Sequence, residues 1–281
     1  MSGSTVSQLL ICAQQELTIA VRSRWTQIFA VVFAVLSLAV AGSGYVLSGG
    51  SGVQDFARTA ASMTQLIIFL SPMMALLVGT TALSPDRGVA ELLFSQPVGR
   101  ATVMAGKLLG LLEALTAAQA LGFGAAGLVI FSQVGGAGLG GFAILFAGAV
   151  VLTAVFLGIA AVLAVGSGSR RRGRAIASAV VVWFVAVVLI DVLALGAASL
   201  LRSGHASRLL IVTTLANPVD AVRTGVLLAI QGTTAFGSAS LALLRFTHGP
   251  TGAALTIVGS IVVWITLPTL VAAYRIVRAD I

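Results

Sequence analysis

Six long apolar runs, almost free of charged residues, constrain most strongly what this chain can fold into. An α-helix needs about 20 mainly apolar residues to cross the hydrocarbon layer of a bilayer, and each run reaches that length. The runs cover residues 25–47, 63–83, 108–131, 142–165, 175–201 and 252–273. We therefore predict an all-α, polytopic membrane protein in which residues 1–281 form a single domain with six transmembrane helices.

The composition excludes a soluble enzyme. Only 9% of the residues are charged, whereas a soluble domain carries roughly 25%. The net charge of +8 could suggest a nucleic-acid partner, but the cations cluster between apolar runs and form no basic helix face, so none is expected. The single cysteine, Cys12, and two distant histidines lack metal-ligand spacing, so we expect no metal or other cofactor on this chain.

The Lys and Arg residues predict the orientation in the membrane, because cytoplasmic segments are enriched in both. If the N-terminus is cytoplasmic, eleven of the sixteen fall in cytoplasmic segments. These eleven are Arg22, Arg24, Arg87, Arg100, Lys107, Arg170, Arg171, Arg172, Arg174, Arg275 and Arg278. We therefore predict a multi-pass protein with both termini in the cytoplasm.

Three segments outside the spans have patterns of their own. Residues 1–24 repeat apolar side chains every three or four positions, which predicts an amphipathic helix on the cytoplasmic surface or against a partner. The cytoplasmic segment 84–107 has a helical core, VAELLFSQ, which either transmits force from a soluble motor or is only a solvated loop. The external segment 202–250 predicts short re-entrant or interfacial pieces separated by a turn at Asn217 and Pro218. Asp220 and Arg223, three residues apart, are spaced to pair on a helix.

Two carboxylates lie within the apolar runs, where an unpaired charge costs about 2.5–3.5 kcal/mol on insertion scales. Glu113 is close in sequence to Lys107 and can reach the membrane interface. Asp191 lies deeper in its run, so we expect it to face the bundle interior, a cavity or a partner. Either it has a functional or assembly role, or it is part of simple polar packing.

No nucleotide-binding motif is complete. Gly106-Lys107 resembles the end of a phosphate loop, but Leu108 stands where Ser or Thr would bind magnesium. Two glycine patterns of the dinucleotide type, beginning at Gly122 and Gly136, lie inside a span and in an external turn rather than between a strand and a helix. ATP and Mg²⁺ are therefore expected on a separate partner subunit.

Several motifs, taken in order, resemble those of ABC-2-type transporter permeases, and the resemblance covers nearly the whole chain. Gln15-Glu16-Leu17 and the sequence RSRW at 22–25 are similar to the N-terminal interface helix of that family. Gly88-x-x-Glu91-Leu92-Leu93, Gln96-Pro97, Arg100 and Gly106-Lys107-x-x-Gly110 are similar to its coupling segment between spans two and three. Within the family, residues 56–59 (FART), 183–191 and 217–223 (NPVDAVR) most resemble the permeases of transporters for nitrous oxide reductase maturation.

This resemblance implies a type V exporter-like permease of the bacterial inner membrane. It implies a homodimer of permeases, two cytoplasmic ABC ATPase subunits, a periplasmic partner protein, and a copper- or sulfur-related cargo. It assigns ATPase coupling to Glu16, Gly88, Glu91, Leu92, Leu93, Pro97, Arg100 and Lys107. It assigns external partner docking to Arg58, Asn217, Pro218, Asp220 and Arg223. Val89 departs from the family pattern, which has Gly-Thr at this point of the coupling segment.

The sequence leaves three other functions open. One is an ABC-2 exporter of lipid, drug or polysaccharide. The second is a secondary transporter that uses Asp191, which would show inverted repeats and work without an ATPase. The third is a membrane anchor that transports nothing, which would tolerate disruption of the coupling segment.

Overall fold

The computed structural model describes residues 5–48, 53–84, 99–134, 138–167, 172–232 and 238–278. Within these residues the chain is helical and has no strand. The first long helices are α2 (Arg24–Ser48), α3 (Val53–Leu83), α5 (Arg100–Val134) and α6 (Leu139–Ser167). A fifth apolar stretch, Gly173–Leu200, and α12 (Pro250–Arg278) complete six segments that are long and apolar enough to cross a membrane. The prediction of an all-α protein with six spans is therefore confirmed.

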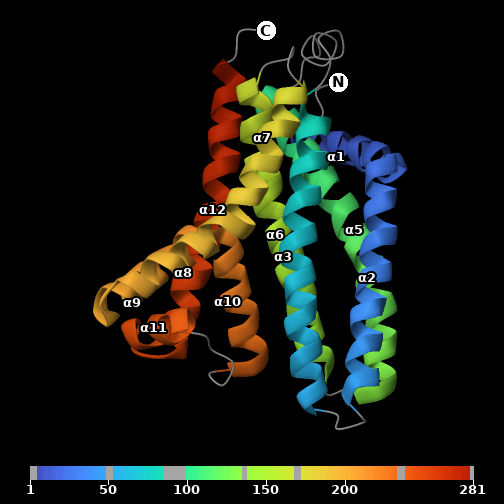
Figure 1. The fold of residues 1–281 in the computed structure, drawn as a ribbon. Coiled ribbons are helices and arrows are strands. Elements are labelled where there is room, and N and C mark those ends of the chain that lie inside the picture. The colour runs from blue at the N-terminus through green and yellow to red at the C-terminus, as the bar shows by residue number, and fades with distance from the viewer. Residues whose placement is uncertain are drawn as a thin grey trace.

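The six segments form an elongated bundle around α6 (Figure 1). α6 packs against α3, α5 and α12, and its sequence carries no charged residue on any side. A helix that is apolar all round is suited to burial on all sides. Glycines bring neighbouring helices close: a Cβ at Gly79 of α3 would lie 2.7 Å from the Cβ of Ala160 in α6. α6 therefore forms the centre of the core.

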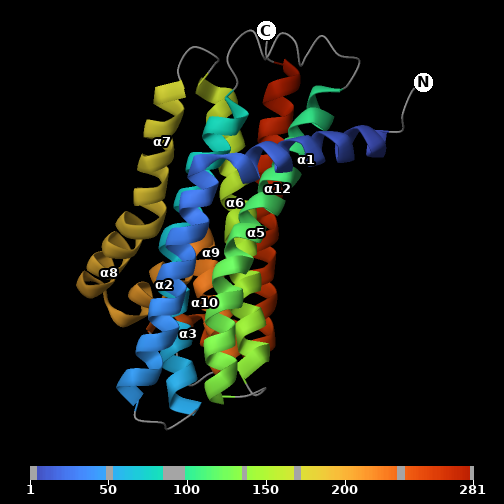
Figure 2. The ribbon, with the colours of Figure 1, turned by 90° about the vertical axis from the view of Figure 1, so that its right-hand side faces the viewer.

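One end of the bundle holds α1, the start of α5 and the end of α12 (Figure 1); by the positive-charge pattern we term it the predicted cytoplasmic end. α1 (Thr5–Arg22) does not join the bundle lengthwise but lies across α5 (Figure 2). Ala13, Glu16 and Ala20 are its buried residues. Val6, Leu10 and Ile11 are exposed, which leaves apolar side chains for a membrane surface or a partner.

The third span begins at Arg100 rather than at residue 108, so the end of the predicted coupling segment belongs to α5. Arg100, Gly106 and Lys107 lower the hydropathy of residues 100–107, so the sequence pattern favours a connection there. In the fold, Lys107 is paired with Glu16, and Gly106 lies against α1. The helical core expected at 89–96 lies outside the described residues.

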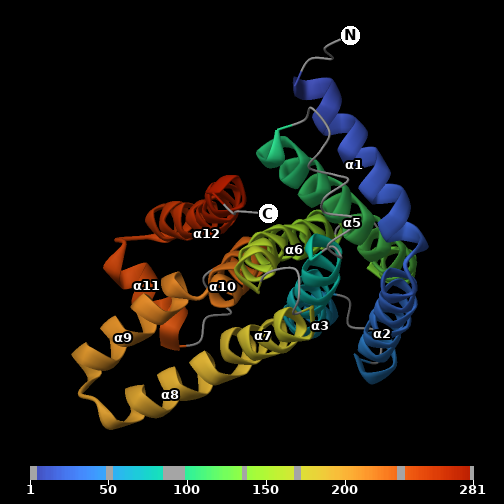
Figure 3. The same ribbon diagram turned by 90° about the horizontal axis from the view of Figure 1, so that it is seen from above.

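The fifth span, expected over 175–201, is found at Gly173–Leu200 and contains a break in its α-helix. α7 (Arg172–Phe184) passes into a π-helical turn, η2 (Val185–Leu189), and then into α8 (Ile190–Leu200). α8 turns away from the bundle and runs beside α9 (Ser203–Ala216) (Figures 1 and 3). Hydropathy records only that these residues are apolar, so it does not detect the bend.

In the described part of the predicted external segment lie α9, α10 (Pro218–Gln231) and α11 (Ser238–Phe246). α10 returns into the bundle and packs against α6 and α12 (Figure 3). Close contact is possible because Gly148 of α6 faces α10: a Cβ there would lie 2.6 Å from Cγ2 of Val226. The two short apolar pieces expected on either side of Asn217 are therefore parts of α9 and α10.

Candidate functional site

An ion pair joins α1 to α5 at the predicted cytoplasmic end. The Lys107 ammonium donates to the Glu16 carboxylate at 2.6 Å, and their side chains are 19% and 5% exposed. The same ammonium lies 3.5 Å from the carbonyl oxygen of Ala82, near the end of α3. A pair this far from water is costly to break, because the remaining charge is left without a counter-ion. The contact therefore fixes α1 against α5, and the same ammonium also joins α5 to the end of α3.

Two glycines of α5 allow α1 to approach closely enough for this ion pair. A Cβ at Gly106 would lie 2.5 Å from the Cβ of Cys12, and a Cβ at Gly110 only 2.3 Å from the Ala13 carbonyl oxygen. No real side chain tolerates such distances. Gly106 and Gly110 lie one turn apart on one face of α5, so together they form the groove in which α1 rests. We refer to Glu16, Lys107, Gly106 and Gly110 as the α1–α5 junction.

The junction lies close to the segment that connects the second and third transmembrane helices, α3 and α5. Residues 85–98, which lie between α3 and α5, are outside the described residues. Of the predicted coupling residues, Gly88, Glu91, Leu92, Leu93 and Pro97 fall there. Arg100 is the first residue of α5, and Glu16 and Lys107 form the junction. A coupling role for these residues stays a prediction.

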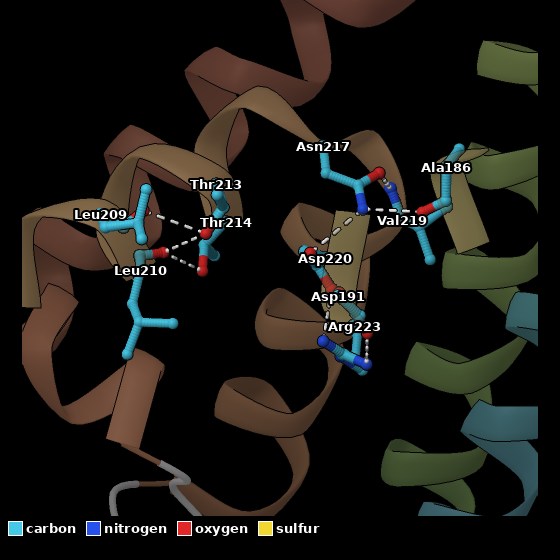
Figure 4. Close-up of polar contacts among 10 residues, drawn as sticks. All are labelled: Ala186, Asp191, Leu209, Leu210, Thr213, Thr214, Asn217, Val219, Asp220 and Arg223. Atoms are coloured by element: carbon cyan, nitrogen blue, oxygen red, sulfur yellow. Dashed lines mark hydrogen bonds and ion pairs between the residues drawn. The ribbon is translucent and has the colours of Figure 1, made fainter. Parts of the chain in front are cut away.

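A second polar cluster lies where α10 meets the fifth span (Figure 4). Arg223 of α10 donates to the Asp191 carboxylate at 2.9 Å and also pairs with Asp220 on its own helix. Asp191 is the second residue of α8, so the ion pair joins α10 to the segment that follows η2. Asp220 is 5% exposed, whereas the side chains of Asp191 and Arg223 are 27% and 30% exposed.

Asn217 organises the start of α10. Its side-chain oxygen accepts from the backbone N–H of Val219 at 3.1 Å, and Pro218 occupies the first helical position. Both features are typical of a helix N-terminus. Its amide nitrogen donates to the Asp220 carboxylate at 3.1 Å and to the Ala186 carbonyl oxygen of η2 at 2.8 Å (Figure 4). Asn217 thus caps α10 and attaches it to the π-helical turn.

The charges of this cluster partly balance one another. Two of its charged residues, Asp220 and Arg223, lie on α10, which is not one of the six membrane-spanning segments. Burial raises the pKa of the Asp220 carboxyl to about 7; Arg223 opposes the rise, and the neighbouring Asp191 adds to it. The raised pKa and the shared guanidinium both reduce the uncompensated charge that this cluster brings against the apolar bundle.

Comparison with known proteins agrees with this architecture. A family model described as "ABC-2 family transporter protein" matches residues 10–281. A probable ABC transporter permease protein NosY of Stutzerimonas stutzeri is 32% identical over 280 residues, covering 97% of this chain and 99% of that protein. The protein of the same name from Pseudomonas aeruginosa is 36% identical over 218 residues, covering 75% of this chain and 78% of its own length. The chain belongs to the ABC-2 transporter family.

In this ABC-2 permease, most of the residues predicted to dock an external partner make contacts within the chain itself. Asn217, Pro218 and Asp220 are buried within the described fold, and Asp220 and Arg223 form the pair expected from their spacing. Arg58 lies in the second turn of α3. A role of these residues in docking an external partner stays a prediction.

The two acids expected within the spans have different surroundings in this permease. Asp191 pairs with Arg223 of α10, and its side chain is 27% exposed. A functional or assembly role for Asp191 stays a prediction. Glu113 is exposed on α5 and has no ion pair with another described residue. Among the described residues, no group of three or more His, Cys, Asp or Glu side chains could hold a metal ion.

Sequence reasoning missed a buried amide in the core of the permease. Gln119 of α5 has no exposed surface. Its amide nitrogen donates to Ser71 Oγ of α3 at 3.0 Å and to Thr153 Oγ1 of α6 at 2.8 Å. A lone glutamine in an apolar run was the available signal, because a buried amide needs partners on neighbouring helices.

Proposed function

We propose that this chain is the membrane-spanning permease subunit of an ABC transporter that couples ATP hydrolysis by a partner subunit to transport or force transmission across the membrane. The α1–α5 junction is the observation that carries the proposal. It fixes a surface helix to α5, and Lys107 also contacts the end of α3. α3 and α5 are the two helices on either side of segment 85–98, through which a cytoplasmic motor would act. The family membership of the chain supports the same function.

The proposed assembly contains two copies of this chain and two cytoplasmic ABC ATPase subunits that bind ATP and Mg²⁺. Its place is the bacterial inner membrane, with both termini in the cytoplasm, as the positive charges predict. Exposed apolar side chains along two spans suit contact with lipid or a second copy. They include Trp25, Ile28, Val31 and Val35 of α2 and Leu255, Val258, Val262 and Leu267 of α12.

The proposed biological role is maturation of nitrous oxide reductase, with a periplasmic partner and a copper- or sulfur-related cargo. Support comes from the two relatives, both named as the NosY permease. The exposed helices α9 and α11 offer a surface for a partner, with Arg208 and Arg245 exposed on them.

A charge swap at the junction tests the coupling role. Glu16→Lys and Lys107→Glu each place like charges together in a largely buried contact, where loss of one partner costs about 3–5 kcal/mol. In the purified complex, the permease should stimulate the ATPase rate of its partner subunit. We expect each single variant to lower this stimulation at least several-fold. The double variant restores opposite charges and should recover most of the coupling.

The measurement is the ATPase rate of the purified complex, together with the amount of ATPase subunit that co-purifies. Glu113→Lys is the matched control, because it reverses an exposed charge on the same helix, α5. Normal coupling in both single variants, at normal expression, would rule out the junction as the path of force. Absence of any co-purifying ATPase would reject the proposed function itself.

A further inference from the structure

The π-helical turn η2 has no cause in its own sequence. Residues 185–189 read VAVVL, without the proline, glycine or serine that usually interrupts a helix. The residues on either side, Phe184 and Ile190, have ordinary α-helical dihedral angles. The N–H of Ile190 nevertheless bonds to the carbonyl of Val185, five residues earlier. Something outside the segment must therefore stabilise the wider turn.

That stabilisation comes from α10. The Asn217 amide donates to the Ala186 carbonyl within η2, and Arg223 binds Asp191, the second residue after it. Asn217 is 1% exposed, so water cannot replace its hydrogen bond to Ala186. Asp220 holds Arg223 from the same helix. The N-cap of α10 therefore contacts the π-helical turn, and the second turn of α10 contacts the second residue after it.

A π-turn contains one more residue than the α-helical turn it replaces. Conversion to α-helix would rotate α8 about its axis by roughly 100° relative to α7, the angle of one residue. Such a rotation would carry Asp191 away from Arg223. Of these two registers, the π-helical one that the structure shows and an unbroken α-helix, only the π-helical one keeps both contacts with α10.

We propose that η2 is a hinge of the fifth span, held in its π-helical form by Asn217 and Arg223 of α10, and that loss of these contacts straightens the span. α7 packs against α3, whereas α8 packs against α9. The hinge therefore lies between the half of the span that starts at the predicted cytoplasmic end and the helices α8–α10. If the chain has the proposed function, on which this step rests, the hinge passes movement of α7 to the helices α8–α10.

Distance measurement between two spin labels tests the hinge in the full-length permease. Labels replace Val181 of α7 and Leu195 of α8, which are both 60% exposed, in a Cys12→Ser background. In an unbroken helix, backbones fourteen residues apart lie about 21 Å from each other, and a bend shortens this separation. Asn217→Ser keeps a side chain that caps α10 but removes the amide donor to Ala186. We expect the distance distribution to shift toward that of the unbroken helix.

Trp183→Phe is the matched control, because it removes another hydrogen bond from the same span, the one to the Phe69 carbonyl, without touching η2. It should leave the distance unchanged. Asp191→Asn weakens the ion pair with Arg223 and should give a mixture of both distances. A wild-type distribution in both hinge variants would refute the hinge, and Asp191→Asn decides alone if Asn217→Ser does not fold. No ATPase is needed, so this outcome is independent of the proposed function.

Discussion

Gln119 places an amide side chain in the middle of the apolar bundle and joins three spans with two hydrogen bonds. Gln119→Leu keeps the volume but removes both bonds and leaves Ser71 Oγ without this donor. Hydrogen bonds between membrane helices contribute about 0.6 kcal/mol on average in double-mutant cycles, so we expect a loss of about 1–2 kcal/mol. Thermal unfolding in detergent should show a midpoint a few degrees lower. Gln65→Leu, at an exposed position of α3, is the control, and an equal shift in it would contradict the prediction.

Gly110 matters because α1 lies directly against it. Gly110→Ala would place a methyl group 2.3 Å from the Ala13 carbonyl, so α1 must move away from α5. The half-buried thiol of Cys12, which lies on the same side of α1 facing Gly106, reports this movement. We expect maleimide labelling of Cys12 to become several-fold faster. Gly124→Ala, where the Cβ meets open space on the same helix, should leave the rate unchanged. Equal rates in all three proteins would show that α1 does not rest on Gly110.

At the scale of elements, apolar length was sufficient to predict the spans, because a helix in lipid must satisfy its own backbone and cover about 30 Å. It did not predict the junction between α1 and α5. Lys107 and Glu16 are 91 residues apart, so only the folded arrangement brings them together. The Asp220–Arg223 pair was predictable, since both residues lie on one helix at a spacing that places them on the same face.

The fifth span and α10 show why other features escaped prediction. α10 carries Asp220 and Arg223, so its hydropathy resembles that of an external segment, yet the pairing of these charges lets it pack against α6 and α12. The turn η2 depends on Asn217, which lies 31 residues beyond Ala186. A local pattern cannot specify a helix break that a distant side chain stabilises.

At the scale of the whole molecule, the distribution of cations predicts one orientation. The helix α1, the starts of α5 and α7 and the end of α12 lie at one end of the bundle (Figure 1), and they carry most of the eleven cations assigned to the cytoplasm. Moving this end to the outside would place those positive charges against the membrane potential. The positive-charge rule therefore predicts that this end of the bundle faces the cytoplasm, even though Arg202, Arg208 and Arg245 lie in the predicted external segment.

Cysteine labelling of whole cells tests this orientation in a Cys12→Ser background. His248→Cys lies at an exposed position between α11 and α12, and Arg278→Cys lies at the exposed end of α12. A membrane-impermeant maleimide should label the cysteine at 248 in intact cells and the cysteine at 278 only after the membrane is permeabilised. α12 separates the two positions by the length of one span, so their labelling must be opposite if it crosses the bilayer. The reverse pattern would invert the orientation, and it would place the α1–α5 junction out of reach of a cytoplasmic ATPase.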